Sequence, residues 1–280
     1  MKPIQIFTLT TIAGCILFSC TTYRYINSAS PPNVPLFKEK GESKVTAYYS
    51  GEGGSDITQK YAHGFDVHGA YALSNHWAVT AGYFFRREKD YYTTRNSIFD
   101  SSDVRYKRNI LDVGAGYFVF LDASKKISAN IYAGIGEGNF SINDAGFNDS
   151  LAYNRFHNSS ITKWYIMPSL NFFSSQSFRF SFATKFSFVH YGKIQTSYTG
   201  YELSYFGLDK IANTTLYFFE PAFSFQFGSR EVPWLGINIV SSFTSDYHSH
   251  DDYNESHLNV RGANLSIGLS ADFSKMKKKK

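Results

Sequence analysis

Cysteine is scarce in this sequence, with only Cys15 and Cys20 among 280 residues. Cys15 lies in an apolar N-terminal stretch with the form of a removable export signal, so the chain beyond it has one thiol. A single thiol excludes an internal disulfide and a metal site built from several cysteines. Long hydrophobic runs are also missing: beyond this stretch no window of 18 residues is apolar. We therefore exclude a transmembrane helix.

An excess of charge of one sign is confined to the C-terminus. The formal net charge is +5, and residues 274–280 alone contain five lysines. The rest of the chain is close to neutral, so the pI of about 8.9 gives no reason to expect a nucleic acid as partner. We expect the lysine tail to be a solvated end, and contact with anionic headgroups or cell wall is the alternative.

Aromatic residues, in contrast, are abundant and regularly spaced. Between Phe178 and Tyr191, phenylalanine occupies positions 178, 180, 182, 186 and 188, while the positions between them are mostly polar or small. A period of two indicates an extended strand with one aromatic and one polar face. Strands of soluble proteins are typically about 5–6 residues long. This alternation lasts roughly a dozen residues, which suits a tilted strand that crosses a bilayer.

The same pattern recurs along the chain and predicts ten strands. They are residues 44–51, 62–73, 77–85, 106–121, 127–140, 162–172, 178–191 and 215–227, a ninth from Leu235, and a tenth at 265–273. Their connections alternate between long (52–61, 86–105, 141–161, 192–214, 244–260) and short (74–76, 122–126, 173–177, 228–233). Long external loops, short periplasmic turns and an even strand number are typical of outer-membrane barrels. The predicted fold is an all-β, antiparallel, up-and-down transmembrane β-barrel.

Two prolines conflict with this interpretation, since proline cannot donate to a strand ladder. Pro168 and Pro221 lie inside predicted strands, so we expect a bulge or a strand end near each. A periplasmic β-sandwich is the alternative architecture, in which the aromatic rows would pack against a second sheet.

The residues that alternate with the apolar rows should face a narrow lumen filled largely by side chains. Many of them are small, including Gly114, Gly116, Gly134, Gly136, Ala183, Ser187, Ser224, Ser266 and Gly268. Five are charged: Asp112, Arg179, Lys185, Glu220 and Asp272, with Lys163 expected near a rim. Because an unpaired buried charge is costly, we expect Lys185 or Arg179 to pair with Glu220. We interpret this network as structural; a selectivity filter is the alternative.

The N-terminal region predicts export and lipidation. Residues 1–19 have a basic start and a short apolar core, as in a signal peptide. Leu17-Phe18-Ser19-Cys20 resembles a bacterial lipobox. That resemblance implies cleavage before Cys20 and acylation of its thiol and amine; an ordinary secretory peptide is the alternative. Residues 20–42, with three prolines, are predicted to be a lipidated tether, followed by a barrel at 43–273 and a basic tail at 274–280.

The last predicted strand ends on an aromatic residue, Phe273. This ending resembles the C-terminal signature by which the barrel-assembly machinery selects outer-membrane proteins. Besides outer-membrane lipids, the expected partners are therefore the barrel-assembly and lipoprotein-export machineries.

A polar cluster lies in the last long loop, residues 245–257, and includes His248, His250, Asp251 and Asp252. Histidine and carboxylate side chains could hold a divalent metal. Histidine–aspartate pairs could instead activate water, as in the omptin-type outer-membrane proteases, although their residue pattern does not match this chain. A solvated loop is the third interpretation and the one we adopt, with neither a metal nor a catalytic site assigned.

Lipid-modifying barrels use a serine–histidine pair that faces the bilayer. The candidates here are His190 near Ser187, and His68. His190 shares the parity of the phenylalanine row, and no serine lies at a matching position, so the signal for this chemistry is weak.

Two further segments carry a family resemblance. Residues 33–42 (NVPLFKEKGE) and 64–79 (GFDVHGAYALSNHWAV) resemble the uncharacterised outer-membrane β-barrel lipoproteins of Bacteroidota. The resemblance implies the outer membrane of a diderm bacterium and supplies no catalytic residues. Surface lipoproteins of such bacteria often carry acidic residues just after the lipidated cysteine. Residues 21–25 have none, which favours an anchor in the periplasmic leaflet.

We therefore expect a small outer-membrane β-barrel lipoprotein with no enzymatic activity and no cofactor, in a structural, adhesive or narrow-pore role. The alternatives are an outer-membrane hydrolase, either omptin-like or lipid-modifying, and a surface receptor that captures a metal or another ligand.

Overall fold

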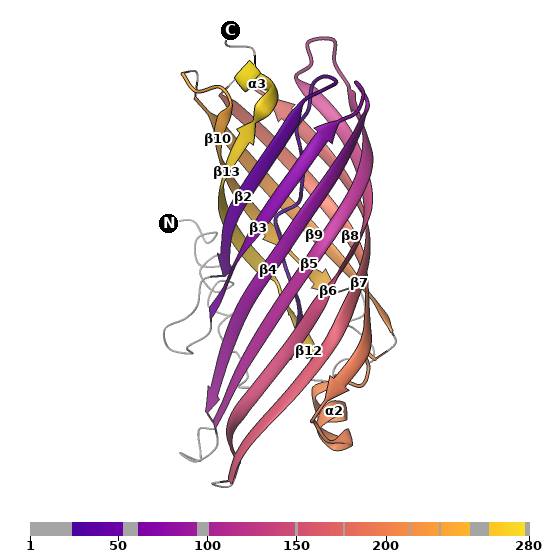
Figure 1. The fold of residues 1–280 in the computed structure, drawn as a ribbon, viewed down its shortest axis with the longest axis vertical. Helices are drawn as coiled ribbons and strands as arrows, with labels where there is room; N and C mark the ends of the chain where they lie inside the picture. The colour runs from indigo at the N-terminus through magenta and orange to yellow at the C-terminus, as the bar shows by residue number, and fades with distance from the viewer. Residues whose placement is uncertain are drawn as a thin grey trace, which may run out of the picture.

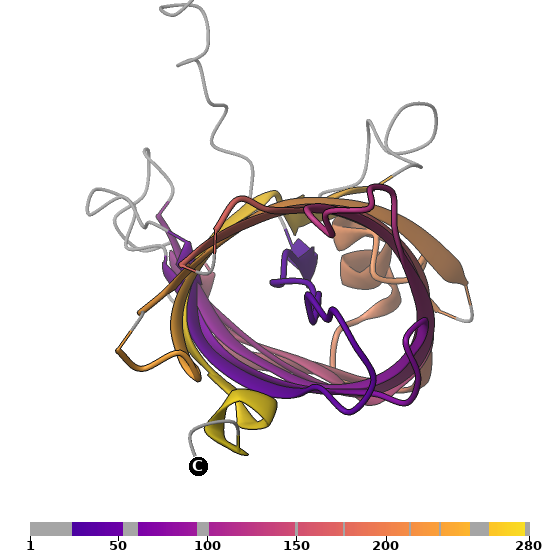
Figure 2. The ribbon, with the colours of Figure 1, turned by 90° about the horizontal axis from the view of Figure 1, so that it is seen from above.

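Ten strands close into one antiparallel barrel (Figures 1 and 2). The computed structural model describes residues 24–52, 61–93, 101–148, 151–175, 177–212, 214–229, 231–246 and 258–277. The barrel strands are β2 (Ser43–Glu52), β3 (Tyr61–Ala72), β4 (Trp77–Thr93), β5 (Ser101–Phe120), β6 (Ile127–Asn148), β7 (Leu151–Phe173), β8 (Phe178–Thr196), β9 (Thr215–Gly228), β10 (Leu235–Phe243) and β13 (Ala263–Asp272). Each pairs with its neighbour in sequence, and the β13–β2 ladder closes the ring. The up-and-down topology predicted from the sequence is confirmed.

Several strands are longer than the sequence predicts. The predicted loop 86–105 is largely strand, because β4 continues to Thr93 and β5 begins at Ser101. The predicted loop 141–161 is likewise a continuation of β6 and β7, which leaves only residues 149–150 between them. These extensions have polar residues on both faces, so they lack the apolar alternation that marks the rest. Ladder hydrogen bonds hold them as strand all the same.

The last strand ends one residue earlier than predicted. β13 ends at Asp272, and Phe273 is the first residue of the short helix α3 (Phe273–Lys277). The terminal aromatic residue therefore follows the barrel instead of closing its final strand. The ladder between β13 and its neighbour β10 ends just before this helix. Its last pair at that end joins Ala271 of β13 to Leu235, the first residue of β10.

Both prolines coincide with an interruption of a ladder, as expected. Between β7 and β8 the paired residues pass from Ile166–Phe186 to Ser169–Ala183, so that Pro168 is skipped. On β9 the pairing with β10 ends at Ala222, one residue after Pro221. The short strand β11 (Ser245–Asp246) resumes the pairing at Phe219. Each proline thus lies where no donor to that neighbour is needed.

The outer face of the barrel is apolar. Trp77 is 55% exposed, Val113 54% and Ile267 57%. They belong to a set that encircles the barrel, which includes Tyr49, Phe65, Leu111, Ile131, Ile166, Phe182, Phe219, Ile237 and Leu269. A continuous apolar surface of this extent is suited to lipid and not to water. No helix in the described part of the chain is long and apolar enough to span a membrane.

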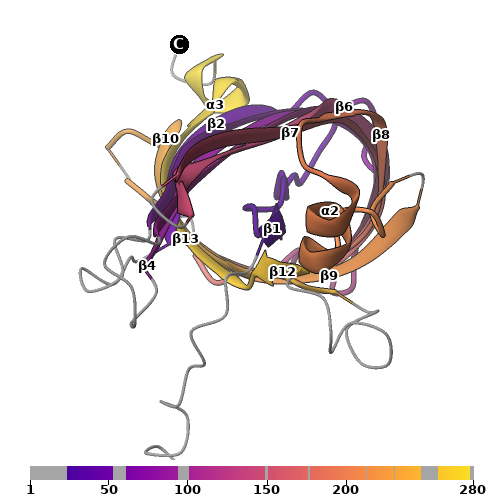
Figure 3. The same ribbon diagram turned by 90° about the horizontal axis from the view of Figure 1, so that it is seen from below.

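The N-terminal segment, residues 24–42, lies inside the barrel. Both end-on views show this segment in the lumen (Figures 2 and 3). Its first part forms β1 (Arg24–Ser28), which pairs in parallel with β12 (Leu258–Arg261), the segment that leads into β13. We expected residues 20–42 to be a tether, and the described part of it is an internal plug.

The two mouths of the barrel differ. The short turns and α3 lie at one end, and the helix α2 (Gly200–Phe206) lies at the other (Figure 1). In the turn at Asp122, hydrogen bonds from the hydroxyl of Ser124 and from the backbone of Ile127 and Lys126 lower the pKa of Asp122 to about 2. By the rule for outer-membrane barrels, the end with short turns is periplasmic and the end with α2 is external.

The apolar outer face generates a first prediction. Val113→Arg places a charge in the middle of the apolar face of β5, and we expect it to lower the free energy of unfolding from lipid vesicles by about 2–4 kcal/mol. Leu121→Arg, beside the periplasmic turn, is the matched control and should cost about 0–1 kcal/mol. Denaturant titration followed by tryptophan fluorescence measures both values. Equal, small costs would contradict a membrane-spanning outer face.

Candidate functional site: the occupied lumen

The plug contacts the wall from one mouth to the other. Near the external mouth, the backbone oxygen of Ile26 accepts bonds from Arg108 Nε (3.1 Å) and the Tyr191 hydroxyl (2.8 Å). Midway, Lys185 Nζ donates to Ser30 Oγ at 3.0 Å. At the periplasmic end, Gly41 N donates to the oxygen of Ala72 at 2.9 Å. The segment therefore runs along the whole lumen.

Apolar side chains seal the space around the plug. Ile26 is fully buried in a cluster with wall residues of the external half, among them Phe84, Tyr106, Phe140, Ile161, Val189, Leu216 and Phe218. Phe37 packs against Phe118 in a second cluster nearer the periplasmic end, with ring centroids 6.4 Å apart. The plug thus has hydrophobic contacts at two levels, separated by a polar zone.

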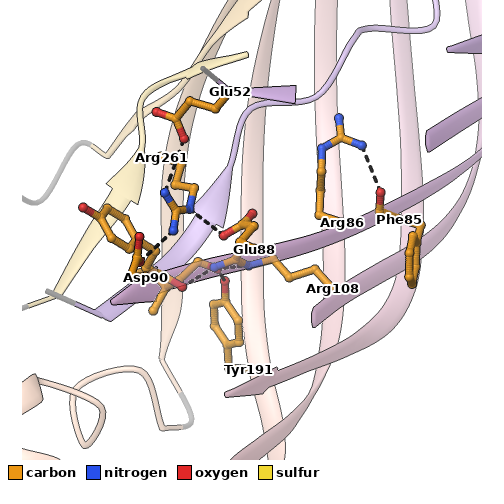
Figure 4. A network of polar contacts seen from close by, with 10 residues as sticks. Glu52, Phe85, Arg86, Glu88, Asp90, Arg108, Tyr191 and Arg261 are labelled. Atoms are coloured by element: carbon orange, nitrogen blue, oxygen red, sulfur yellow. Dashed lines mark hydrogen bonds and ion pairs between the residues drawn. The ribbon is translucent and has the colours of Figure 1, made fainter. Parts of the chain in front are cut away.

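A buried ion network holds the external half together (Figure 4). Glu88 on β4 accepts from two arginines, Arg108 of β5 at 2.5 Å and Arg261 of β12 at 2.7 Å. Arg261 also pairs with Asp90 at 2.6 Å and with Glu52 at 3.4 Å. Arg108 donates in addition to the backbone oxygens of residues 25 and 26. The network therefore joins β2, β4, β5 and β12 to the plug.

Arg24 is the plug's own charged residue in this region. Its side chain is 2% exposed, and Nη2 pairs with Asp144 of β6 at 2.5 Å. Asp144 also accepts from Ser102 Oγ (2.6 Å) and from the Tyr198 hydroxyl (3.1 Å). The guanidinium of Arg24 lies 3.8 Å from the ring centroid of Phe206 in α2. These contacts compensate for burial of the two charges, which would be costly if unpaired.

The predicted pair in the middle of the lumen is present. Lys185 Nζ lies 3.4 Å from Glu220 Oε2, which confirms that pairing. Lys163, expected near a rim, instead lies beside them, with Nζ 3.6 Å from the same oxygen. Arg179, the other proposed partner, lies near the periplasmic end with Cζ 5.6 Å from the centroid of the Phe173 ring. The prediction is therefore right for Lys185 and wrong for the position of Lys163.

Little space remains in this polar zone. A cavity of about 30 Å³ lies between the plug and residues that include Asp66, His68, Asp112, Lys163 and Lys185. On this measure a water needs about 10–15 Å³, so the cavity has room for roughly two waters.

The expectation of small residues facing a narrow lumen is confirmed at Gly114 and Gly134. A Cβ added at either would lie 2.6 Å from the Tyr165 hydroxyl, too close for an ordinary contact.

The described residues bring together no other site predicted from the sequence. Cys20 and the loop residues His248, His250, Asp251 and Asp252 lie outside the described residues, within which no group of His, Cys, Asp and Glu could hold a metal. Ser187 is buried and donates to Glu220, whereas His190, three residues along the strand, lies on the opposite face. The two side chains therefore do not form a serine–histidine pair.

His68, the other histidine proposed for this chemistry, is buried. Its ring lies edge-on to Tyr48, with centroids 5.4 Å apart, and it lines the cavity described above. It therefore faces the lumen and not the lipid.

Sequence reasoning missed most of the external network. The sequence predicts a loop for Arg86, Glu88 and Asp90, and a tether for Arg24. The sequence does contain a signal for this network. Arg86, Glu88 and Asp90 continue the parity of Gly82 and Phe84, which face inward. Strand continuation at that parity would have placed three charges in the lumen.

The comparisons with known proteins give distant structural likenesses. No protein-family model matches the chain, and no curated protein matches it. The translocator domain of the autotransporter NalP from Neisseria meningitidis is 8% identical, with a TM-score of 0.48 over 96% of this chain and 94% of that one. The outer membrane protease OmpT from Escherichia coli is 12% identical, with a TM-score of 0.42 over 84% and 94%. Ail, the attachment invasion locus protein of Yersinia pestis, is 12% identical, with a TM-score of 0.32 over 84% and 99%.

The class of protein follows from the barrel itself. Ten antiparallel strands close on themselves, the outer face carries a band of apolar side chains, and charged side chains such as Arg108, Lys185 and Glu220 are buried on the lumen side. These features define a transmembrane β-barrel of the outer-membrane type.

Glu88 offers a sharp test of the network. Glu88→Gln keeps the side chain's size but removes one charged partner from each of two buried arginines, Arg108 and Arg261. We expect the free energy of unfolding to fall by about 3–5 kcal/mol. The same change at Glu137, which is exposed, should alter it by no more than about 0.5 kcal/mol. Denaturant titration in lipid vesicles, read by the band shift between folded and unfolded barrel, measures both; equal effects would show that the network contributes no stability.

Proposed function

We propose that this protein is an outer-membrane lipoprotein whose barrel is closed by its own N-terminal segment and serves a structural or adhesive role without enzymatic activity. The lipobox at residues 17–20 supports acylation at Cys20. The two segments that resemble Bacteroidota barrel lipoproteins support the same assignment and the diderm setting. Export would then require the lipoprotein-export and barrel-assembly machineries as partners.

The occupied lumen is the observation that carries this proposal. The plug residues Ile26 and Arg24 are almost completely buried against the wall, and the cavity of about 30 Å³ in the polar zone has room for roughly two waters. A conducting pore needs a continuous water-filled path. Of the three roles that the sequence leaves open, the narrow pore is therefore the one that the geometry supports least.

The external end supports an adhesive role. Tyr201 and Tyr205 stack on one face of α2 and are 79% and 43% exposed. Helix α2 is held rigidly, since Thr199 caps its start and Arg155 pairs with Glu202 at 2.8 Å. Exposed tyrosines on a fixed support are frequent in protein-binding surfaces.

Two alternatives of other classes remain proposals of lower rank. A hydrolase, omptin-like or lipid-modifying, or a metal-capturing receptor would use the loop with His248, His250, Asp251 and Asp252. We expect His248→Ala and Asp251→Ala to change neither peptide or lipid hydrolysis nor zinc retention by purified protein. Loss of hydrolysis in either variant would select the enzyme, and loss of retained zinc would select the receptor.

Conductance tests the closed lumen directly. Purified full-length protein in planar bilayers should show no conductance steps above background. A variant that lacks residues 24–35 should conduct, because the polar inner wall would then enclose water. Heat-dependent gel migration must first show that this variant folds. Stable conductance by the wild-type protein would overturn the proposal, whatever the variant does.

A further inference from the structure

The direction of the plug determines at which mouth the N-terminal end of the described chain lies. Strand β2 begins at the periplasmic end, where Gly41 bonds to Ala72 beside a short turn. From there the chain, followed backwards, rises past Ser30 and Ile26 to Arg24. Arg24 pairs with Asp144, near the tip of the hairpin formed by β6 and β7. The plug therefore crosses the barrel from the periplasmic to the external end.

The height of Arg24 follows from the strand that holds its partner. Asp144 lies 17 residues beyond Ile127, the first residue of β6. At about 3.3 Å per residue and a tilt of about 40°, that is roughly 43 Å along the barrel axis. The apolar band of an outer-membrane barrel is only about 25 Å tall. Arg24 thus lies beyond the membrane on the external side.

The wall beside this part of the plug is low. β10, β13 and β2 have 9, 10 and 10 residues, against 22 and 23 for β6 and β7. A strand of this length rises about 23 Å along the axis, so the rim on that side lies close to the outer membrane surface. Ser28 pairs with Arg261, whose Nη1 contacts Glu52, the last residue of β2. The plug is therefore at rim height at Ser28, and Arg24 is beyond it.

We propose that the lumen serves as the passage by which the N-terminus reaches the cell surface, so that the acyl group on Cys20 inserts into the outer leaflet of the outer membrane beside β2 and β13. The lipid part of this inference rests on the proposed function, whereas the passage rests on the described plug alone.

Chain length makes the two leaflets distinguishable. Three residues lie between Cys20 and Arg24, and the four Cα–Cα steps can span at most about 14 Å. The periplasmic surface is roughly 40 Å from Arg24 along the axis, by the same rise and tilt. The outer surface beside the low rim is the nearer of the two, because Arg24 is only about 13 Å of strand beyond Ser28. This placement differs from the periplasmic anchor expected from the sequence, which rested on the lack of acidic residues at positions 21–25.

An epitope inserted between Thr22 and Tyr23 of the full-length protein tests the passage. We expect antibody to label it equally in intact and permeabilised cells. Two other insertions serve as matched controls. An epitope between Asp209 and Lys210, at the external end, should be labelled equally in intact and permeabilised cells. One between Ser124 and Lys125, in a periplasmic turn, should be labelled only after permeabilisation. An N-terminal epitope that behaves like the turn insertion, in a barrel that still shows heat-dependent migration, would overturn the proposal.

A smaller probe covers the case in which the inserted epitope prevents folding. Tyr23→Cys should react with a membrane-impermeant maleimide in intact cells, whereas Ser124→Cys should react only after permeabilisation. The opposite result at position 23 would refute the passage.

Radiolabelled palmitate separates this inference from the proposed lipidation. Label should enter the wild-type protein and be lost in Cys20→Ser. Absence of label together with a surface-accessible position 23 would refute the lipid anchor and keep the passage. Incorporated label together with a shielded position 23 would refute the passage and keep the anchor.

Discussion

Closure of the backbone hydrogen-bond ladder is the constraint on which the rest of this structure depends. In lipid every peptide group of a strand needs a partner, and a ring of ten strands supplies one without leaving an edge. The ring turns every second side chain inward, so it creates a lumen as an unavoidable consequence. Whatever fills that lumen must satisfy the polar groups that face it.

In this protein two segments of the same chain, residues 24–42 and β12, fill much of the lumen. Residues 24–42 bring the backbone oxygen of Ile26 to Arg108 and Tyr191. They also bring the guanidinium of Arg24 to the carboxylate of Asp144. Segment β12 brings Arg261 to Glu88 and Asp90. Glu88, Asp90 and Asp144 of the wall are thus paired with arginines that are not part of the wall. The parallel pairing of β1 with β12 joins these two inner segments into one unit, anchored to the barrel through β13.

The different heights of the strands connect this filling to the proposed role. The tall β6–β7 hairpin supports Arg24 and, through Arg155, the tyrosine-bearing helix α2. The low side at β2, β10 and β13 leaves the start of the plug above its rim. In the proposed role, this mouth would combine the raised helix α2 as a binding surface with an exit for the N-terminus beside the membrane.

The sequence by itself determined the strands that touch lipid, their number and their order, because alternation along a strand is a local pattern that apolar surroundings enforce. It also offered Lys185 or Arg179 as the partner of Glu220, because adjacent strands bring their inward residues together, and the structure selects Lys185. The strand extensions outside the membrane could not be predicted from the sequence, because no apolar face marks them there. Only the tertiary structure decided that residues 24–42 enter the lumen and that Arg24 meets Asp144. Those partners are 120 residues apart, and no periodicity in the sequence relates positions that meet only when the ring closes.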